Sequence, residues 1–451
     1  MKQGVIASSD NRVVYGLGVT GLSCARHLHW LGHRFCVVDT RAEPPGLEVL
    51  RQEMPEVGVF TGEIPLSVLE SASELIVSPG IGLEDEYVQA AVAAGVTVRG
   101  DIDLFIEQAD APVIGITGSN AKSTVTELVG AMAKEAGLNV GVGGNLGTPA
   151  LLLLDEGREL YVLELSSFQL ERAGALNLAV ATVLNVSPDH LDRHGNMQRY
   201  HQAKHRIFRG CHKAVVNRDD SLTQPPLTDD VEFISWRMKE PELNGFGLRE
   251  VEGRNFLVQG FDTLIAVDDL PLAGRHNVAN VLAALALGYG VGLPMPAMLA
   301  AIRHFRGLPH RCQRVATVDD VHYVNDSKGT NVGATEAALN GIGGERDVVL
   351  IAGGQAKGAD FRVLHQAVGR HCHHVLVMGE AAAVLTQVLA EIVTVSTVAC
   401  MGEAVERAAA LANRGDTVLL SPACASFDMF KGYADRGEHF VAAVNALGDK
   451  V

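Results

Sequence analysis

The stretch "VIGITGSNAKSTVTELVG" at residues 113–130 decides the fold class of the middle of this chain. An apolar run, typical of a buried strand, ends in the turn GSNA at 118–121, and a helical pattern follows. Backbone N–H groups of such a turn converge on an anion, and the helix adds its positive end. Lys122 can reach a terminal phosphate, and the hydroxyl of Ser123 or Thr124 can bind Mg²⁺. The stretch therefore predicts a nucleotide-phosphate loop in an α/β domain.

The match to the general pattern G-x-x-x-x-G-K-[ST] is imperfect, because Ile116 and Ala121 stand where glycines are expected. The alternative is an ordinary surface turn that happens to contain Gly, Ser and Lys. The position between an apolar strand and an amphipathic helix favours phosphate binding. If the backbone at position 121 needs a positive φ, Ala121 is strained.

A second phosphate-binding pattern, "VVYGLGVTGLSCARHL", lies at residues 13–28. It holds a full G-x-G-x-x-G at 16–21 between a strand and a helix, and Asp39 follows at the end of the next apolar run, where an acidic group meets a ribose hydroxyl. The motif reports a diphosphate and a ribose, and it does not specify nicotinamide. The alternative is a tight strand–helix turn with no ligand.

Short apolar runs alternate with helical patterns along the chain, which predicts parallel sheets. We expect three α/β domains: a Rossmann-like domain at 1–107, a central P-loop ATPase-like domain with a mixed or parallel sheet at 108–307, and a Rossmann-like domain at 308–451. Within the central domain, residues 211–275 are less regular and predict further strands, some of them antiparallel. A hinge is expected near 306–309, "RGLP".

Composition narrows the class of partner. A net charge of −16 argues against nucleic acid or an anionic membrane as the main partner, and 5% aromatic residues make a base-stacking surface an unfavourable interpretation. Seven scattered Cys without a CxxC motif are typical of a reduced, cytoplasmic protein. No run has the length of a signal peptide core or of a membrane span.

Polar side chains follow several of the expected strands. Glu164 ends one apolar run, and Asn185 and His190 follow another. Ligands of parallel sheets bind at the carboxyl ends of strands, and Mg²⁺ prefers oxygen ligands. His190 could equally be a hydrogen-bonded structural residue, and Lys204, on an expected helix, could face solvent.

In the last third of the chain Lys328, Lys357 and Lys431 each follow an apolar run, which favours an anion-binding face, for example for carboxylates. By contrast, "RHCHH" at 370–374 lies where a helix meets a strand, and we interpret it as structural.

Two phosphate loops, a magnesium site and a cationic third domain together predict a ligase. ATP would phosphorylate a carboxylate, and an amine would attack the acyl phosphate. Phosphorylation turns a poor leaving oxygen into a good one, while Mg²⁺ and Lys neutralise charge. The first loop would then hold a substrate nucleotide and the second ATP.

The motifs "TGSNAKST", "GGNLGTP", "LELSSFQL", "LNVSPDHLDRH", "GRHNVAN", "PHRCQ", "NDSKGTN" and "LLSPACASFDMFKGYADRG" occur in the order seen in the Mur ligases, and the chain resembles this family over its whole length. The resemblance implies addition of D-glutamate to UDP-N-acetylmuramoyl-L-alanine through an acyl phosphate, with ATP and Mg²⁺, in peptidoglycan precursor synthesis. It implies a cytoplasmic enzyme without a membrane span, which we expect to be a monomer.

The resemblance also assigns residues. ATP is implied to contact Gly118, Ser119, Asn120, Lys122, Ser123, Thr124, Asn277, Asn280, Arg311 and Asp326. Catalysis and metal binding are implied for Lys122, Ser123, Glu164, His190 and Lys204, the last as the carbamylated lysine of the family. The UDP substrate is implied to contact Gly18, Val19, Thr20, Gly21, Asp39, Thr40, Arg41, Gly80, Asn145 and Ser166. The D-glutamate pocket is implied to comprise Lys328, Thr330, Lys357, Ser426, Phe427 and Tyr433.

Two positions depart from the family pattern in addition to Ala121: Gln355 stands where Asp is frequent, and Tyr433 where Phe is common. Four alternatives are weighed against this interpretation. They are a ligase for another amino acid, a folylpolyglutamate synthase, an NAD-dependent dehydrogenase and a nucleotide-dependent switch. The N-terminal GLGVTG domain argues against the synthase, and a dehydrogenase would leave the Lys122 loop without a role.

Overall fold

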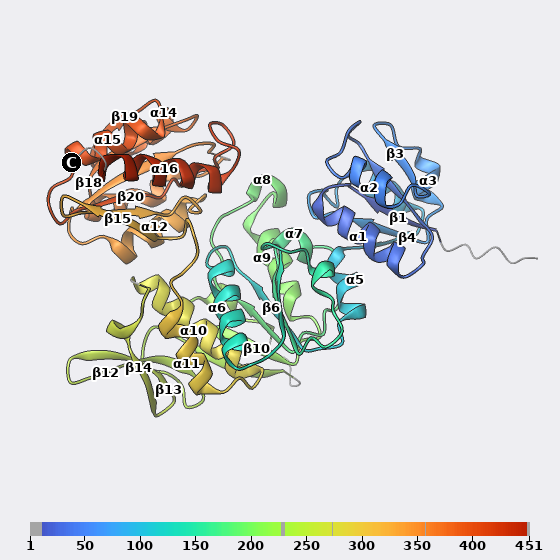
Figure 1. The fold of residues 1–451 in the computed structure, drawn as a ribbon, viewed down its shortest axis with the longest axis horizontal. Coiled ribbons are helices and arrows are strands. Elements are labelled where there is room, and N and C mark those ends of the chain that lie inside the picture. Colours follow the sequence, from blue (N-terminus) through green and yellow to red (C-terminus); the bar gives the residue numbers. More distant parts are fainter. Residues whose placement is uncertain (1–10, 227–230, 273, 357, 449–451) are drawn as a thin grey trace, which may run out of the picture.

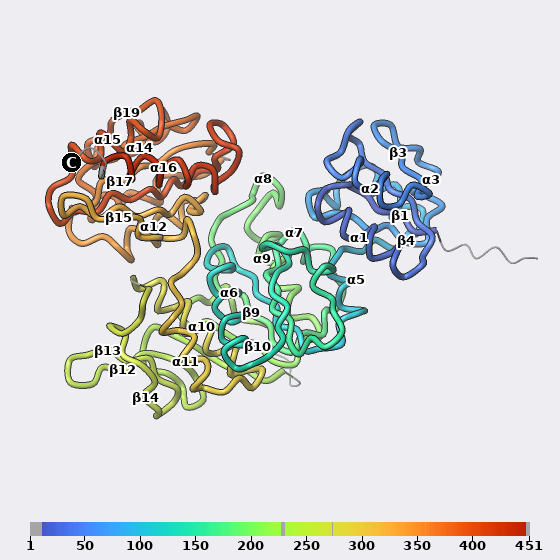
Figure 2. Tube along the Cα trace, viewed as in Figure 1, coloured from blue at the N-terminus to red at the C-terminus, as the bar shows by residue number. Residues whose placement is uncertain are grey.

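Three sheets, each covered by helices, make up the computed structural model, which describes residues 11–226, 231–272, 274–356 and 358–448. Figures 1 and 2 show them as three bodies in chain order, with the middle body between the two others. The expected class, a three-domain α/β protein with parallel and mixed sheets, is confirmed.

The first sheet has the order β3-β2-β1-β4-β5 and is parallel throughout. Its central strands are continuous apolar runs because helices cover both faces. Its strands are β1 (Arg12–Tyr15), β2 (Phe35–Asp39), β3 (Gly58–Thr61), β4 (Glu74–Val77) and β5 (Thr97–Arg99). Its helices are α1 (Val19–Trp30), α2 (Leu47–Glu53), α3 (Leu66–Glu70), α4 (Glu86–Ala93) and α5 (Asp101–Gln108).

The second sheet has nine strands in the order β14-β13-β12-β11-β10-β9-β6-β8-β7. Strands β6 to β12 pair with one another in parallel. Strand β12 then pairs antiparallel with β13, and β13 with β14, as expected for the less regular region. The strands are β6 (Val113–Thr117), β7 (Val140–Gly144), β8 (Leu160–Glu164), β9 (Val180–Val183), β10 (Lys213–Asn217), β11 (Glu232–Trp236), β12 (Phe246–Val251), β13 (Arg254–Gln259) and β14 (Asp262–Ala266).

Helices α6, α10 and α11 pack together on one side of this sheet around a core that includes Leu128 and Leu282. The helices are α6 (Lys122–Glu135), α7 (Ser167–Leu170), α8 (Leu191–His194), α9 (Met197–His205), α10 (Arg275–Gly290) and α11 (Met295–His304). Short 3₁₀ segments are η1 (Ala150–Leu153), η2 (Arg206–Phe208), η3 (Ser221–Thr223) and η4 (Val267–Asp269).

The third sheet has the order β15-β16-β20-β17-β18-β19, with one antiparallel edge pair, β15 and β16. Its strands are β15 (Gln313–Val318), β16 (Val321–Asn325), β17 (Val348–Gly353), β18 (Cys372–Met378), β19 (Thr394–Thr397) and β20 (Thr417–Leu420). Its helices are α12 (Val332–Ile342), η5 (Phe361–Leu364), α13 (His365–His371), α14 (Ala382–Leu389), α15 (Met401–Leu411) and α16 (Tyr433–Gly448).

Four of these strands, β3, β12, β15 and β19, were not expected from the sequence. Each lies at the edge of its parallel sheet or in the antiparallel extension, and its residues are partly exposed and mixed in polarity. A continuous apolar run is typical of a strand whose two faces are both buried, so these partly exposed strands carry a weaker signal.

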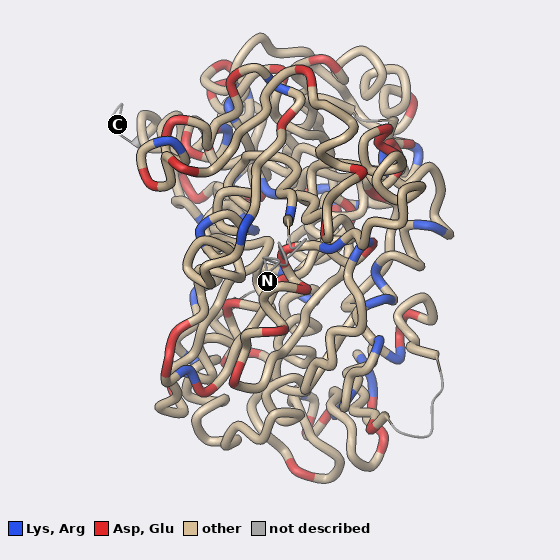
Figure 3. Tube along the Cα trace, turned by 90° about the vertical axis from the view of Figure 1, so that its right-hand side faces the viewer, with Lys and Arg blue, Asp and Glu red and all other residues tan. Residues whose placement is uncertain are grey.

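Acidic and basic residues are interspersed along the side of the trace drawn in Figure 3. All seven cysteines are free thiols in this structure. Within the described parts of the chain, no helix has both the length and the hydropathy that crossing a bilayer requires.

Candidate active site

The predicted phosphate loop connects β6 to the N-terminus of α6. Lys122 folds back over this loop, and its Nζ donates hydrogen bonds to the carbonyl oxygens of Gly118 at 2.8 Å and Ser119 at 3.0 Å. Burial lowers the pKa of Lys122, and the nearby carboxylates of Glu164 and Asp189 oppose that shift. An ammonium that donates its hydrogen bonds to neutral carbonyl oxygens can exchange them for stronger, charge-assisted bonds to a phosphate.

Ala121 adopts the left-handed conformation that the loop demands, with φ of 68° at the N-cap of α6. The strain expected for a residue with a Cβ at this position is therefore present. Asn185 keeps the turn in place: its Oδ1 accepts the Asn120 N–H at 2.8 Å. Its backbone carbonyl accepts the Ser119 N–H at 3.0 Å.

Glu164, at the end of β8, is the centre of a buried polar network next to the loop. One carboxylate oxygen accepts the Ser123 hydroxyl at 2.5 Å, and the other accepts the side-chain amide of Asn145 at 2.7 Å. From the third domain, Arg311 donates to the Ser123 hydroxyl oxygen at 2.6 Å. Residues 188 positions apart therefore meet at one hydroxyl.

Lys204 is a buried lysine of the site. It is 2% exposed, so the alternative of a solvent-facing lysine is wrong. Its Nζ donates to the Gly118 carbonyl at 2.8 Å and lies 4.5 Å from the centre of the Tyr200 ring. Burial lowers the pKa of Lys204 well below its usual value, and the charge of Lys122 lowers it further. The neutral amine is therefore favoured at this position.

His190 lies at the start of α8, directly after Asp189. It has φ of 53° at the N-cap of α8, and its ring packs edge-on against Phe168 with centroids 4.9 Å apart. The neighbouring Asp189 accepts a hydrogen bond at 3.0 Å from the side-chain amide of Asn331, the N-cap of α12. The same amide of Asn331 donates to Asn120 at 3.3 Å, which links the third domain to the phosphate loop.

A cavity of about 230 Å³ lies between the second and third domains. Most of the residues implied to contact the nucleotide base, ribose and phosphates line it. They are Asn120, Thr124, Asn277, Asn280, Arg311 and Asp326, together with Ala121 and Lys328. The structure thus brings together residues from the phosphate loop, α10 and the third domain.

Asp326 and Lys328 sit at the third-domain wall of this cavity. The Asp326 carboxylate accepts the Ser421 hydroxyl at 2.7 Å, and burial raises its pKa to about 6. The Lys328 Nζ lies 3.8 Å from the centre of the Tyr433 ring, and burial together with the charge of Arg311 lowers its pKa to about 8. A cation over an aromatic face keeps its donors free for an anion.

The other residues of the implied D-glutamate pocket lie near that wall or beyond it. The Thr330 N–H donates to the Lys328 carbonyl at 2.8 Å, Ser426 is buried, and Phe427 is 68% exposed. Lys357 lies outside the described residues. Lys431, which the sequence placed at an anion-binding face, is exposed, and its N–H donates to Asp435.

The first domain carries the second glycine motif at the start of α1. A Cβ on Gly21 would lie 1.7 Å from the Gly16 carbonyl oxygen, so only glycine fits there. Val19 is 73% exposed, and Gly18 and Thr20 are partly exposed. The motif therefore presents its turn to solvent at the N-terminus of a 12-residue helix.

Asp39 holds the base of this motif. It accepts the Leu17 N–H at 2.7 Å and the Arg41 side chain at 2.6 and 2.9 Å, while Thr40 and Arg41 are exposed. Burial raises the pKa of Asp39, but the hydrogen bonds from Arg41 and Leu17 outweigh burial and lower it overall. In this structure Asp39 serves first as a structural acceptor.

Two arginines of the second domain donate hydrogen bonds to the loop that follows β4 and contains Gly80. Arg172 donates to the carbonyls of Val77 and Ser78 at 2.9 Å and of Ile81 at 2.7 Å. Arg193 donates to the carbonyls of Gly80 at 3.2 Å and Ile81 at 2.8 Å. The Glu171 carboxylate pairs with both arginines. Ser166 is the N-cap of α7, the short helix that precedes Glu171 and Arg172.

Sequence reasoning missed Tyr200, Asn331, Arg172 and Arg193. The Tyr200 hydroxyl lies 2.9 Å from the Ser119 hydroxyl of the phosphate loop. The sequence could have indicated Tyr200, because it precedes Lys204 by four residues and so lies on the same helix face. The other three act across domain boundaries, and no local pattern marks such contacts.

Three family models match the chain in order. The Mur ligase MurD-like N-terminal domain matches residues 10–100, the Mur ligase middle domain 116–288, and the Mur ligase glutamate ligase domain 310–424. The UDP-N-acetylmuramoylalanine–D-glutamate ligase of Pseudomonas aeruginosa is 53% identical over 445 residues, covering 98% of this chain and 99% of the relative. The ligase of the same name from Pseudomonas savastanoi pv. phaseolicola is 52% identical with the same coverage.

Solved structures show the same fold at low identity. A pseudomurein peptide ligase type C from Methanothermus fervidus superposes with a TM-score of 0.62 at 17% identity, covering 97% of this chain and 100% of that one. The UDP-N-acetylmuramate-alanine ligase MurC from Thermotoga maritima gives a TM-score of 0.60 at 18% identity, covering 97% and 99%.

Proposed function

Because this chain belongs to the Mur ligase family, we infer that it joins D-glutamate to UDP-N-acetylmuramoyl-L-alanine in an ATP-dependent step of peptidoglycan precursor synthesis. The observation that carries this conclusion is identity of 52–53% over 98% of the chain to ligases of that name. ADP and phosphate are the other products. Such an enzyme supports cell-wall biogenesis and, through it, cell shape and division, and we expect it to work in the cytoplasm as a monomer.

In the proposed reaction the phosphate loop binds the ATP phosphates. Lys122 would leave the carbonyls of Gly118 and Ser119 for the γ-phosphate, where its charge offsets the charge of the transferring group. The terminal carboxylate of the L-alanyl substrate takes the phosphoryl group. The neutral amine of D-glutamate then attacks the carbonyl carbon, inorganic phosphate leaves, and the nitrogen loses one proton, so that the amide keeps one N–H.

Mg²⁺ fits the residues beside the loop. Ser123 and Glu164 supply a hydroxyl and a carboxylate 2.5 Å apart, and Mg²⁺ favours a few oxygen ligands completed by phosphates and water. Among the described residues, no group of three or more His, Cys, Asp and Glu could hold a metal by itself. When bound, the ion would neutralise phosphate charge.

Lys204 and His190 are the remaining proposed metal ligands. Burial lowers the pKa of the Lys204 amine, which favours its neutral form. A neutral amine can add carbon dioxide and lose one proton to form a carbamate with oxygen ligands. His190 would bring an imidazole to the edge of the same site from α8.

The UDP substrate would bind across the first two domains. We propose that the GLGVTG turn, with Gly18, Val19, Thr20 and Gly21, receives the diphosphate, and that Asp39, Thr40, Arg41 and Gly80 surround the nucleoside and phosphates. Asn145 and Ser166 would then face the sugar and peptide part. This arrangement gives each glycine loop one ligand, UDP in the first domain and ATP in the second.

D-Glutamate would enter from the third domain. Lys328, held over the Tyr433 ring, would pair with a carboxylate of the amino acid, and Thr330, Ser426, Phe427 and Lys357 complete the proposed pocket. The hydrogen bonds from Arg311 and Asn331 to the second domain support an arrangement in which this pocket faces the phosphate loop.

Phosphate release from ATP tests the function. With UDP-N-acetylmuramoyl-L-alanine present, we expect release only when D-glutamate is added, and not with L-glutamate, meso-diaminopimelate or L-alanine. Release without any acceptor would instead identify a nucleotide-dependent switch.

The matched variant for this assay is Lys122→Ala. It should lose at least about a hundredfold in kcat, because one charge on the transferring phosphoryl group is no longer offset. Full turnover by this variant would contradict the role proposed for the loop.

A further inference from the structure

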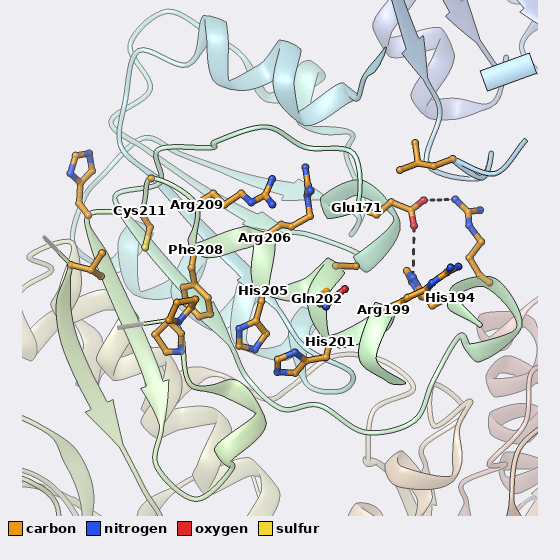
Figure 4. Close-up of a pocket in the computed structure, with 18 of the residues that line it drawn as sticks. Glu171, His194, Arg199, His201, Gln202, His205, Arg206, Phe208, Arg209 and Cys211 are labelled. Carbon is orange, nitrogen blue, oxygen red and sulfur yellow. Dashed lines mark hydrogen bonds and ion pairs between the residues drawn. The ribbon is translucent and has the colours of Figure 1, made fainter. Parts of the chain in front are cut away.

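Helix α9 carries two groups of functional side chains on different faces. Tyr200 and Lys204 are buried against the phosphate loop. His201 and His205 point instead into a cavity of about 1040 Å³ that α9 lines together with η2, Pro225, Pro226 and Val231. Figure 4 shows the two imidazoles side by side in this cavity. The catalytic proposal uses neither histidine.

The two rings are arranged to act as a pair. They stack with centroids 3.9 Å apart and planes 25° from parallel. Both Nε2 atoms are directed at the carbonyl oxygen of Leu222 in η3, at 3.0 Å from His201 and 2.8 Å from His205. Two nitrogen atoms and one oxygen therefore converge on a small volume at the surface of the cavity.

The spacing of the pair is that of known zinc-binding helices. "HQAKH" at 201–205 places the histidines at i and i+4, on one face of a helix, as in H-E-x-x-H metal sites. Neutral imidazole binds zinc, copper and nickel well, whereas Mg²⁺ prefers oxygen ligands. A site of this composition is therefore chemically distinct from the one at Ser123 and Glu164.

We propose that His201, His205 and the Leu222 carbonyl form a site for a divalent transition-metal ion of the zinc type. Each Nε2 gives its lone pair to the metal, so its proton moves to Nδ1 and the imidazole stays neutral. The Leu222 oxygen, freed from two N–H donors, becomes the third ligand. Water from the open cavity completes the tetrahedral coordination that zinc favours.

A metal ion in this site would link α9 directly to η3 at residues 221–223. The present contacts to Leu222 are hydrogen bonds of 2.8 and 3.0 Å, and zinc replaces them by bonds of about 2.0–2.2 Å. Lys204, which precedes His205 directly, lies on the helix that is held. Because the metal ion would bind the folded protein and not the unfolded chain, its binding would also raise the thermal stability of the protein.

Isothermal calorimetry with zinc chloride on the full chain tests the site, with Mg²⁺ in excess and a phosphine reductant. We expect His201→Gln to bind one zinc ion fewer per chain than the unmodified protein, and His205→Gln to show the same loss. His212→Gln is the matched control, because His212 lines the same cavity but is exposed and outside the pair. It should bind as many ions as the unmodified protein.

Equal zinc stoichiometry in the unmodified protein and in both pair variants would overturn the proposal. A nitrogen-detected NMR experiment on histidine-labelled, unmodified protein gives a reading that does not depend on how a variant folds. The Nε2 signals of two histidines should shift together on addition of one equivalent of zinc, and both shifts should be absent from His201→Gln. Shifts confined to other histidines would also overturn it.

Discussion

At the scale of single residues, the site depends on side chains whose conformation or charge is set by burial. Ala121 accepts a left-handed backbone so that the phosphate loop can turn into α6. Lys204 and Lys328 are lysines whose pKa values burial lowers. Each of these properties is unfavourable for the isolated residue and is maintained by the structure around it.

Ala121→Gly should raise the free energy of unfolding by about 0.5–1 kcal/mol. The left-handed conformation costs a residue with a Cβ about 1–2 kcal/mol, and the greater entropy loss of glycine offsets part of that gain. Urea unfolding measures the change. As a control, Ala131→Gly in the interior of α6 should lower stability by about 1 kcal/mol. Destabilisation by both changes would show that position 121 is not strained.

The pKa of about 8 at Lys328 predicts the pH dependence of D-glutamate binding. Below pH 8 the ammonium is charged and can pair with a carboxylate; as pH rises through 8 the charge is lost. The KM for D-glutamate should therefore rise above pH 8. In Lys328→Arg, whose guanidinium stays charged, this rise should disappear between pH 7 and 9.5. A KM that rises equally in both proteins would contradict the prediction.

At the scale of elements, a short segment after α7 connects the first two domains. Arg172 is fully buried and donates to three carbonyls of the loop after β4, and Arg193 from α8 donates to the same loop. Through these hydrogen bonds, Arg172 and Arg193 hold the loop that contains Gly80.

Arg172→Lys should weaken binding of the UDP substrate more than it affects the chemical step. A lysine ammonium cannot reproduce the contacts of a planar guanidinium with three carbonyls, so the loop loses hydrogen bonds from Arg172, although Ile81 keeps its bond from Arg193. We expect the KM for the UDP substrate to rise about tenfold, equivalent to ~1.4 kcal/mol, with kcat changed less than threefold.

The control for Arg172 is Arg199→Lys. Arg199 also contacts the first domain through an ion pair with Glu84, but the Arg199 side chain is 63% exposed and the Glu84 side chain 83% exposed. We therefore expect little change in KM or in kcat. Equal effects of the two substitutions would show that the buried contacts of Arg172 do not position the loop.

At the scale of the whole molecule, the third domain reaches the phosphate loop through Asn331 and Arg311. Asn331 binds Asp189 and Asn120, and Arg311 binds Ser123, so the three-domain arrangement has specific polar contacts at the catalytic centre. The linker at 306–309, our predicted hinge, includes Gly307 with φ of 83°. A change of domain orientation would make or break these contacts.

Asn331→Asp should favour an open arrangement. An aspartate still caps α12, but its carboxylate faces that of Asp189, so the contact becomes repulsive. We expect small-angle scattering with an ATP analogue to give a larger radius of gyration than the unmodified protein gives, and kcat to fall at least tenfold. Asn196→Asp, the same change at the N-cap of α9, is the control. Identical scattering curves for all three proteins would contradict this prediction.

The sequence by itself determined the local parts of this protein: two glycine turns between a strand and a helix, buried strands read as apolar runs, and Lys122 at the start of α6. These features follow from neighbouring residues, because turn geometry and burial periodicity are short-range properties. Edge strands such as β3 were not predicted, since their mixed burial and polarity resemble those of a loop.

Only the tertiary structure decided which distant residues meet. Ser123, Glu164 and Arg311 share one hydrogen-bond network although 41 and 188 positions separate Ser123 from the other two. Lys204 is buried against Gly118, 86 positions away, and nothing in its own helix distinguishes it from a surface lysine. Such contacts arise from the packing of whole domains, in which side chains far apart in the chain become neighbours. Patterns among neighbouring residues do not predict that packing.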